Sequence, residues 1–487
     1  MHAQHLHKII TQNPTRHFLT DSRNGETYTY TSFFQIAQNA GNFLRKNNIT
    51  KVALVVENSV ELLALYIGAL LEGVVMIPID PTKGKTEIEE ILDEGKCEVI
   101  ICNSTIFEEK IQNKTILHIE EIKSQFYENN TTFDPQRTLE IDGEKCYSIT
   151  FTSGTSGKPK GVMHSFNNLY GSGRDFAEAM TFNSSHIFYH NLPMTYMAGL
   201  LNLFLVPLGA GARIVIGNRF SIFEAMKFWK PIIKYEINAF FLIPTIVSLL
   251  MKVDKGTKGI DYCKTKNILA GIGTAALDQN LRRQFTEKYG FNLYESYGSS
   301  EALFNATNSP ANDRIEGVGK IVHNVECHFA DDGEIQIRNP HNMLGYYNMD
   351  TAQFIENERY KTGDLGYLSD GYLIINGRKK DLIIRGGVNI SPARIERSIQ
   401  ATKLTGECVI AGTPDPITGE KTVCFYLENT PIEKDTQKQI NQHLTTQLGK
   451  DYVVDEFVSI KEFPRNANGK IDKKKLVAAT SVIENKN

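Results

Sequence analysis

The sequence lacks paired cysteines, a secretory leader and long apolar runs. Its 7 cysteines are scattered and form no Cys-x-x-Cys pair, which argues against a disulfide framework or a zinc site and favours a reducing compartment, the cytoplasm. The N-terminal segment has no apolar run followed by a cleavage site, so it does not resemble a secretory signal. Apolar stretches such as residues 237–251 are too short to cross a bilayer, and Pro244 interrupts that one. We therefore expect no stable membrane insertion.

The chain also lacks a large excess of positive or negative charge. The formal net charge is -3 and no domain-sized segment is strongly basic, which makes nucleic acids and anionic membranes poor partners on electrostatic grounds. Apolar residues make up 41% of the chain and charged residues 22%, as is typical of soluble globular proteins. A chain of 487 residues is too long for one ordinary core, so we expect two or three domains.

The N-terminal part alternates strand and helix patterns. Apolar side chains recur at helical spacing over residues 60–73, and Thr31 is predicted to cap a helix that runs through Leu44. The expected strands are short apolar runs, at residues 51–57, 74–80, 212–217 and 238–244. Strand, helix and strand at this spacing predict parallel β-α-β units and an α/β fold.

The pattern changes after about residue 320. Strands there are joined by Asp-Gly turns at Asp332 and Asp370, and a compact α+β pattern begins at Asp381. Ser391 as N-cap and Pro392 at the first helical position predict a helix start. We place a domain boundary near Lys380, which gives an N-terminal domain of residues 1–379 and a C-terminal domain of residues 380–487.

The most informative segment is SITFTSGTSGKPKGVM, residues 148–163. Its small residues let backbone N–H groups approach an anion closely, while hydroxyls add donors and lysines add positive charge. The predicted polyphosphate-binding residues are Thr152, Ser153, Gly154, Thr155, Ser156, Gly157 and Lys160. The segment is not a Walker A loop, because only Thr155 and Ser156 separate Gly154 from Gly157 and a proline follows Lys158.

At this loop the sequence resembles the adenylate-forming superfamily, which includes acyl-CoA synthetases, adenylation domains of peptide synthetases and luciferases. Further motifs follow in the family's order and spacing, so the resemblance covers nearly the whole chain. It implies a large multi-sheet N-terminal domain, a smaller α+β C-terminal lid, and an active site between the two.

The segment YESYGSSE, residues 294–301, resembles the family's YGxTE motif. Tyr297 offers a flat face to adenine, and Gly298 follows it. Ser300 replaces the usual threonine and keeps a hydroxyl for the α-phosphate. Glu301 is a hard oxygen ligand suited to Mg²⁺. The resemblance implies that these residues bind ATP and its metal ion.

Two further motifs lie at the predicted domain boundary. In YKTGDL, the resemblance implies that Asp364 accepts hydrogen bonds from both ribose hydroxyls. In GRKKDLIIRGG, Arg378 is expected near ribose and phosphate, and Lys380 aligns with the hinge on which the lid pivots. Residues 386–396, GGVNISPARIE, resemble thioester-forming members more than peptide synthetases.

The segment PRNANGKIDKK places Lys470 at the family's catalytic lysine. In the implied reaction, a carboxylate oxygen attacks the α-phosphorus of ATP and pyrophosphate leaves. Negative charge must be held at both centres, and one ammonium between them stabilises the transition state. The resemblance therefore implies that Lys470, Glu301 and Lys380 are the catalytic residues.

The segment PMTYMAGL, residues 193–200, resembles the family's acyl-pocket motif, with Tyr196 where many acyl-CoA synthetases have histidine. Residues 191–200 contain no acidic side chain that could hold an ammonium, which argues against an α-amino acid substrate. Gly271 and Gly273 are expected to line the same pocket, whose apolar and small residues are typical of ligand sites.

These motifs predict an AMP-forming ligase that uses ATP and Mg²⁺ to activate a small-molecule carboxylic acid and then transfers it to a thiol, coenzyme A. A phosphopantetheine arm on an acyl or peptidyl carrier protein is the alternative acceptor, because it presents the same thiol. A non-catalytic nucleotide-binding regulator is disfavoured by the presence of both Glu301 and Lys470. A P-loop kinase is excluded by the loop spacing.

Overall fold

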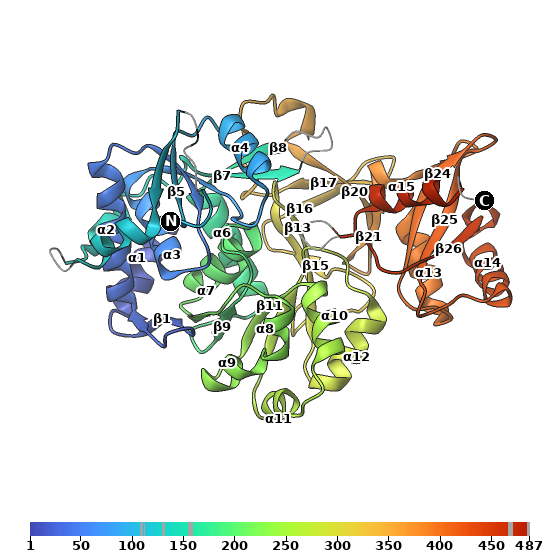
Figure 1. Cartoon of the computed structure of the whole chain (residues 1–487), viewed down its shortest axis with the longest axis horizontal. Coiled ribbons are helices and arrows are strands. Elements are labelled where there is room, and N and C mark those ends of the chain that lie inside the picture. The colour runs from blue at the N-terminus through green and yellow to red at the C-terminus, as the bar shows by residue number, and fades with distance from the viewer. Residues whose placement is uncertain (108–110, 112, 129–131, 154–158, 466–470, 485–487) are drawn as a thin grey trace.

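The computed structural model describes residues 1–107, 111, 113–128, 132–153, 159–465 and 471–484. The strands of these residues form three sheets of 14, 7 and 5 strands. The smallest sheet lies with α13, α14 and α15 at one end of the molecule, drawn in orange and red in Figure 1. The predicted α/β fold, with a large multi-sheet N-terminal part and a small C-terminal part, is confirmed.

The largest sheet combines a parallel and an antiparallel half. Strands β9, β11, β12 and β13 are parallel neighbours, whereas β13 and β14 form an antiparallel pair. Its strands in spatial order are β16 (Glu326–Phe329), β17 (Glu334–Arg338), β20 (Arg359–Ser369), β21 (Tyr372–Arg378), β15 (Lys320–Ile321), β14 (Leu303–Thr307), β13 (Leu293–Ser299), β12 (Leu269–Ile272), β11 (Ala239–Leu242), β9 (Ile187–His190), β10 (Arg213–Ile216), β1 (His17–Asp21) and β2 (Thr27–Thr29), with β19 (Ile355–Glu356) beside β20.

The second sheet contains the strands that flank the predicted phosphate loop. Strands β4, β3, β5 and β6 are parallel, and β7 and β8 form an antiparallel hairpin at the other side. Its order is β18 (Gly345–Tyr346), β8 (Pro159–Ser165), β7 (Cys146–Ser153), β4 (Val75–Pro78), β3 (Lys51–Val55), β5 (Val99–Cys102) and β6 (Thr115–His118).

Helices cover both large sheets. Helix α6 contacts β8 of one sheet and β14 of the other, so it lies between them. Among the described residues, no helix is both long and apolar enough to cross a membrane. The α-helices of the N-terminal part are α1 (His2–Gln12), α2 (Tyr30–Lys46), α3 (Val60–Glu72), α4 (Lys85–Glu94), α5 (Ile119–Ile122), α6 (Phe166–Ala179), α7 (Val206–Gly209), α8 (Ile222–Met226), α9 (Trp229–Lys234), α10 (Pro244–Val253), α11 (Lys258–Thr265) and α12 (Gln279–Tyr289).

The third sheet contains only strands that follow β21 in the chain: β23 (Val388–Ile390), β22 (Ile383–Arg385), β25 (Gly419–Leu427), β24 (Cys408–Asp415) and β26 (Glu456–Ile460). Helices α13 (Pro392–Thr402), α14 (Lys434–Leu448) and α15 (Lys473–Glu484) accompany it. Ser391 caps α13 by accepting a hydrogen bond from the Arg394 N–H, as predicted. The Ser391 hydroxyl also donates to the Asn376 carbonyl, which ties α13 to β21.

Candidate active site

The predicted phosphate loop connects the two strands of the β7–β8 hairpin. Thr152 pairs with Lys160 and Ser153 with Pro159, so these residues lie at the end of the hairpin. The Lys160 ammonium lies 4.7 Å from the ring centre of Phe354. The predicted residues Gly154, Thr155, Ser156 and Gly157 lie outside the described residues.

Glu301 lies against this hairpin through a tyrosine on the neighbouring strand. Strand β18 pairs with β8, which places Tyr346 beside Val162. The Tyr346 hydroxyl donates a hydrogen bond of 2.9 Å to Glu301 Oε1, and its oxygen lies 3.3 Å from the Tyr360 hydroxyl. The phosphate hairpin and the predicted metal ligand are therefore neighbours in space.

A buried histidine makes a second connection between the hairpin and the YESYGSSE motif. His164 on β8 has no exposed surface, and its Nε2 lies 2.6 Å from the carbonyl oxygen of Ser300. Burial lowers the pKa of His164 to about 4, so the ring is neutral near pH 7. Because a carbonyl can only accept, Nε2 carries the proton and donates. His164 thus fixes the backbone that presents Ser300.

Tyr297, Asp364 and Arg378 form one cluster, so three of the predicted motifs meet. The Tyr297 hydroxyl donates to Asp364 Oδ2 over 2.7 Å, and Arg378 Nε lies 2.9 Å from Asp364 Oδ1. Asp364 and Arg378 are cross-strand neighbours on β20 and β21. Asp364 is buried, and burial together with this carboxylate raises the pKa of Tyr297 well above its usual value.

Gly298 is required by the sharp turn of β13 toward Glu301. The register of the β13–β14 pair shifts between Tyr297 and Gly298. A Cβ atom on Gly298 would lie only 2.0 Å from the carbonyl oxygen of Leu303. Only a residue without a side chain can therefore bring Tyr297 and Glu301 into their observed positions.

The predicted acyl-pocket glycines lie beside this cluster. Gly271 on β12 is the cross-strand neighbour of Tyr294 on β13, and Gly273 directly follows β12. Ligands of parallel sheets bind outside the carboxyl ends of the strands, and Gly273 lies at that edge. Tyr196 is half-buried, and burial raises its pKa.

The predicted hinge directly follows Arg378 of the Tyr297–Asp364–Arg378 cluster in the chain. Lys380 is exposed in the short 3-10 helix η5 (Lys379–Asp381), which begins after Arg378. Its neighbour Lys379 bridges Asp332 at 2.5 Å and Glu334 at 3.1 Å. The predicted catalytic Lys470 lies outside the described residues.

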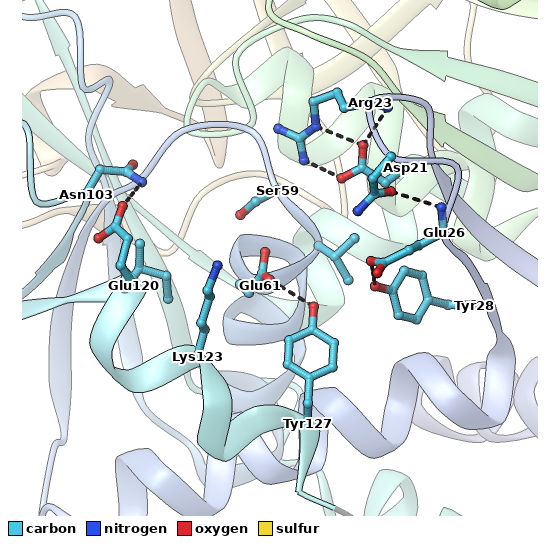
Figure 2. A pocket seen from close by; sticks show the side chains of 13 residues that line it. Asp21, Arg23, Glu26, Tyr28, Ser59, Glu61, Asn103, Glu120, Lys123 and Tyr127 are labelled. Carbon is cyan, nitrogen blue, oxygen red and sulfur yellow. Dashed lines mark hydrogen bonds and ion pairs between the residues drawn. The ribbon is translucent and has the colours of Figure 1, made fainter.

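A pocket of about 290 Å³ lies elsewhere, lined by residues of the β1–β2 turn, the start of α3 and the segment from α5 to Tyr127 (Figure 2). Its polar groups bind one another: Arg23 pairs with Asp21, the Tyr127 hydroxyl donates to Glu61, and Asn103 donates to Glu120. None of the predicted site residues that the structure describes lines it. This pocket is therefore separate from the cluster around Asp364 and Glu301.

Sequence reasoning missed Tyr346 and His164. Tyr346 lies 45 positions after Glu301, and His164 lies 136 positions before Ser300. Both residues reach the site through the pairing of β8 with its neighbours, which is a property of the sheet topology. The one sequence feature that marks His164 is a histidine within an apolar strand pattern.

Residues 6–347 match the family of AMP-binding enzymes, and residues 394–470 match the C-terminal domain of AMP-binding enzymes. The chain belongs to the AMP-binding enzyme family. The resemblance noted from the motifs is confirmed, and so is the predicted reaction class, an AMP-forming ligase that activates a carboxylic acid for transfer to a thiol.

Two relatives and one solved structure illustrate the match. The chain is 25% identical over 465 residues to 2-succinylbenzoate–CoA ligase of Bacillus subtilis, with 92% of each chain covered. It is 29% identical over 347 residues to sulfoacetate–CoA ligase of Cupriavidus necator, which covers 68% of this chain and 66% of that relative. Its fold matches ATP-bound MatB from Rhodopseudomonas palustris with a TM-score of 0.86 at 22% identity, over 99% of this chain and 100% of that one.

Proposed function

We propose that this AMP-binding enzyme joins a carboxylic acid to coenzyme A in two half-reactions, with the predicted domains 1–379 and 380–487 moving about Lys380 between them. The observation that carries the proposal is the meeting of three motifs in one cluster, where Tyr297 and Arg378 flank the Asp364 carboxylate. The contact of Glu301 with the phosphate hairpin through Tyr346 supports it.

The described residues fit a nucleotide and its metal ion. Each oxygen of Asp364 accepts one bond from the protein and has a further lone pair, so both can receive ribose hydroxyls. Glu301 Oε1 accepts from Tyr346, which leaves Oε2 for Mg²⁺, a cation bound by one or two carboxylates together with phosphates. A bound Mg²⁺ neutralises charge on the phosphates. In this proposal Thr152, Ser153 and Lys160 hold the phosphates.

The first half-reaction forms the acyl-adenylate. A carboxylate oxygen of the acid attacks the α-phosphorus, the bond to the β-phosphate oxygen breaks, and pyrophosphate leaves. Ser300 holds the α-phosphate oxygens, and Lys470 stabilises the charge shared by the attacking carboxylate and the phosphorus. Tyr196, Gly271 and Gly273 line the space for the acid.

The second half-reaction consumes the adenylate. The lid rotates at Lys380, the thiol sulfur attacks the acyl carbon, and AMP leaves. Coenzyme A is the acceptor that the names of the relatives support, since each of the two sequence relatives above is a CoA ligase. A closed site limits hydrolysis of the reactive anhydride.

The test is a pyrophosphate-release assay over a panel of carboxylic acids, with and without coenzyme A, in which the nucleotide product is identified. We expect AMP and pyrophosphate, with turnover increased by coenzyme A. ADP would indicate a kinase, and release of neither product with any acid would contradict the proposal. Turnover that needs an acylatable carrier protein instead of coenzyme A would assign the alternative acceptor.

A further inference from the structure

Three phenylalanines form a closed aromatic cluster under the two pocket glycines, and we name it the phenylalanine floor. It consists of Phe176 on α6, Phe241 on β11 and Phe304 on β14. The exposed fractions of these residues are 0%, 3% and 6%. The rings of Phe176 and Phe304 stack with their centres 3.8 Å apart, and Phe241 packs edge-on, 6.1 Å from Phe176 and 6.3 Å from Phe304.

The floor fills the space that the glycines leave. A Cβ atom on Gly271 would lie 3.1 Å from the Phe241 ring and 3.6 Å from the Phe176 ring. A Cβ atom on Gly273 would lie 3.2 Å from the tip of Phe241. Because ring atoms stand within contact distance of both glycines, the missing side chains do not open a tunnel beneath β12.

The floor is also held from three directions. Its rings come from one helix and two strands, and α6 packs against β8 on its other side. Protein interiors are close-packed, so a buried ring in this position cannot move aside without displacing its neighbours. A long acyl chain therefore finds neither an open channel nor a ring that is free to swing away.

The closest neighbours of the two glycines carry no charge. The atoms nearest to Gly271 and Gly273 belong to the floor and to Ser296, whose hydroxyl donates to the Ile272 carbonyl over 3.2 Å. No ammonium or guanidinium is among these nearest atoms, so a second carboxylate on the acid would lack a partner there.

We propose that the phenylalanine floor restricts this enzyme to short monocarboxylic acids with an uncharged tail, and excludes medium-chain and aromatic acids. This inference rests on the proposed function and adds the substrate class to it. Phe241 is the residue that sets the limit, because it alone approaches both glycines among their nearest atoms.

The experiment compares kcat/KM for pyrophosphate release with propionate, hexanoate, benzoate and succinate, in the natural chain and in Phe241→Ala. We expect the natural enzyme to prefer propionate over hexanoate by about a hundredfold or more, since a misfit of even one methylene changes discrimination about tenfold or more. Phe241→Ala should raise kcat/KM for hexanoate at least about tenfold and lower the value for propionate.

Phe182→Ala is the matched control, because Phe182 packs 6.3 Å from Phe176 and 4.7 Å from Phe188 and is not among the atoms nearest to either glycine. Its ratio of propionate to hexanoate should match that of the natural chain. Circular dichroism and ATP binding establish that each variant is folded, and Phe241→Leu provides a milder second variant.

The outcomes separate the inference from the function on which it rests. A natural enzyme that releases pyrophosphate best with hexanoate, benzoate or succinate keeps the proposed function and overturns the floor. A folded Phe241→Ala whose acid preference is unchanged also overturns it. Absence of pyrophosphate release with every acid, in a chain that binds ATP, contradicts the proposed function instead.

Discussion

The hydroxyl of Tyr346 orients Glu301, the predicted metal ligand, through one hydrogen bond. Tyr346→Phe removes the hydrogen bond to Glu301 and leaves the ring in place. A hydrogen bond to a charged group contributes about 1.5–3 kcal/mol, so we expect the Mg²⁺ concentration at half-maximal pyrophosphate release to rise about tenfold or more. Titrating Mg²⁺ at saturating ATP measures this shift.

Tyr347→Phe is the control for that substitution, since the adjacent hydroxyl bonds to Lys51 and not to Glu301. Its Mg²⁺ dependence should equal that of the natural chain. Equal Mg²⁺ dependence of Tyr346→Phe and the natural chain would mean that Glu301 does not need this hydroxyl, or does not bind the metal.

Asp364 carries a separate prediction about the nucleotide. Asp364→Ala leaves the Tyr297 hydroxyl and the Arg378 guanidinium without their shared partner and removes both acceptors proposed for the ribose. Calorimetry should show ATP affinity reduced at least about tenfold, while the KM for the acid changes less. Asp370→Ala is the control, because Asp370 is exposed and pairs with Arg314 at the far end of the same hairpin. Unchanged ATP affinity would remove Asp364 from the nucleotide site.

Single residues of the site could be predicted where a short sequence motif contains the residue. Asp364 follows Gly363 in YKTGDL, and Glu301 ends YESYGSSE, so residue type and motif were sufficient to predict a role for each, and both roles stay predictions. The roles of Tyr346 and His164 could not be predicted, because nothing near them in the chain shows that β8 pairs with β18 and approaches Ser300.

At the scale of elements, the predictions were best where periodicity and caps agree. The expected strand at residues 51–57 is β3, and the expected helix at residues 60–73 is α3, which ends at a Gly73 with φ of 66°. The predicted cap Thr31 was wrong. Thr29 caps α2 instead, because Ser32 completes a reciprocal pair of side-chain and backbone hydrogen bonds with it.

The segment after Tyr196 shows why some elements could not be predicted. Residues Ala198–Leu205 form a π-helix, η3, in a sequence that is apolar except for Asn202. Periodicity distinguishes an amphipathic helix from a strand, but it gives no preference among helix types when every position is buried. All eight residues of η3 are buried, so packing against the surrounding core determines the type of helix.

Gly298→Ala tests the β13–β14 hairpin as an element. A Cβ atom 2.0 Å from the Leu303 carbonyl forces the two strands apart, so Tyr297 and Glu301 lose their relative position. We expect the N-terminal domain to lose at least about 2 kcal/mol of stability and ATP binding to weaken strongly. Thermal unfolding and ATP titration measure both effects.

The comparison for Gly298 is Gly84→Ala at the start of α4, where an added Cβ would meet nothing within 4 Å. This variant should melt and bind ATP like the natural chain. A Gly298→Ala variant that does the same would show that the hairpin tolerates a side chain at this position.

For the whole molecule, Lys470 and Lys380 should fail in different half-reactions. Lys470→Ala should slow adenylate formation by about 10²- to 10³-fold, the usual scale for one electrostatic stabiliser, and still convert synthetic acyl-AMP and coenzyme A to thioester. Lys380→Pro should form the adenylate and transfer it slowly, because proline fixes φ at the proposed pivot. Each variant is assayed with acid plus ATP, and separately with acyl-AMP plus coenzyme A.

The two lysine variants serve as controls for each other. If Lys470→Ala remains folded and loses both half-reactions equally, a lid that rotates between two poses does not describe this enzyme. If Lys380→Pro transfers the acyl group at the normal rate, the pivot lies at another residue.

Buried neutral histidines should make the stability of the whole molecule depend on pH. Burial lowers the pKa of His164 to about 4 and that of His190 to about 3, below the ordinary value of 6.5. As pH falls below 6.5 the unfolded chain binds these protons and the native state does not, so stability is lost on the acid side. Between pH 7 and pH 5 we expect a loss on the order of 2 kcal/mol per histidine. Glu295, whose pKa burial raises to about 7, acts in the opposite direction.

Thermal unfolding at pH 7 and pH 5 measures this dependence. His164→Gln should reduce the difference between the two melting temperatures, whereas His17→Gln should not, because His17 is exposed. A melting temperature that is equal or higher at pH 5 would contradict the assignment of neutral buried rings.

The β20–β21 hairpin carries Asp364 and Arg378 and leads directly into the η5 turn with Lys380. Substitutions of the paired residues Asp364 and Arg378 are therefore expected to affect both nucleotide affinity and rotation at the proposed hinge. The phenylalanine floor lies apart from this hairpin, since Phe241 is on β11 and approaches Gly271 and Gly273. Among descendants of this enzyme, substitutions should accordingly accumulate at the floor, where a single substitution can change the preferred acid. The sequence of the β20–β21 hairpin should change little.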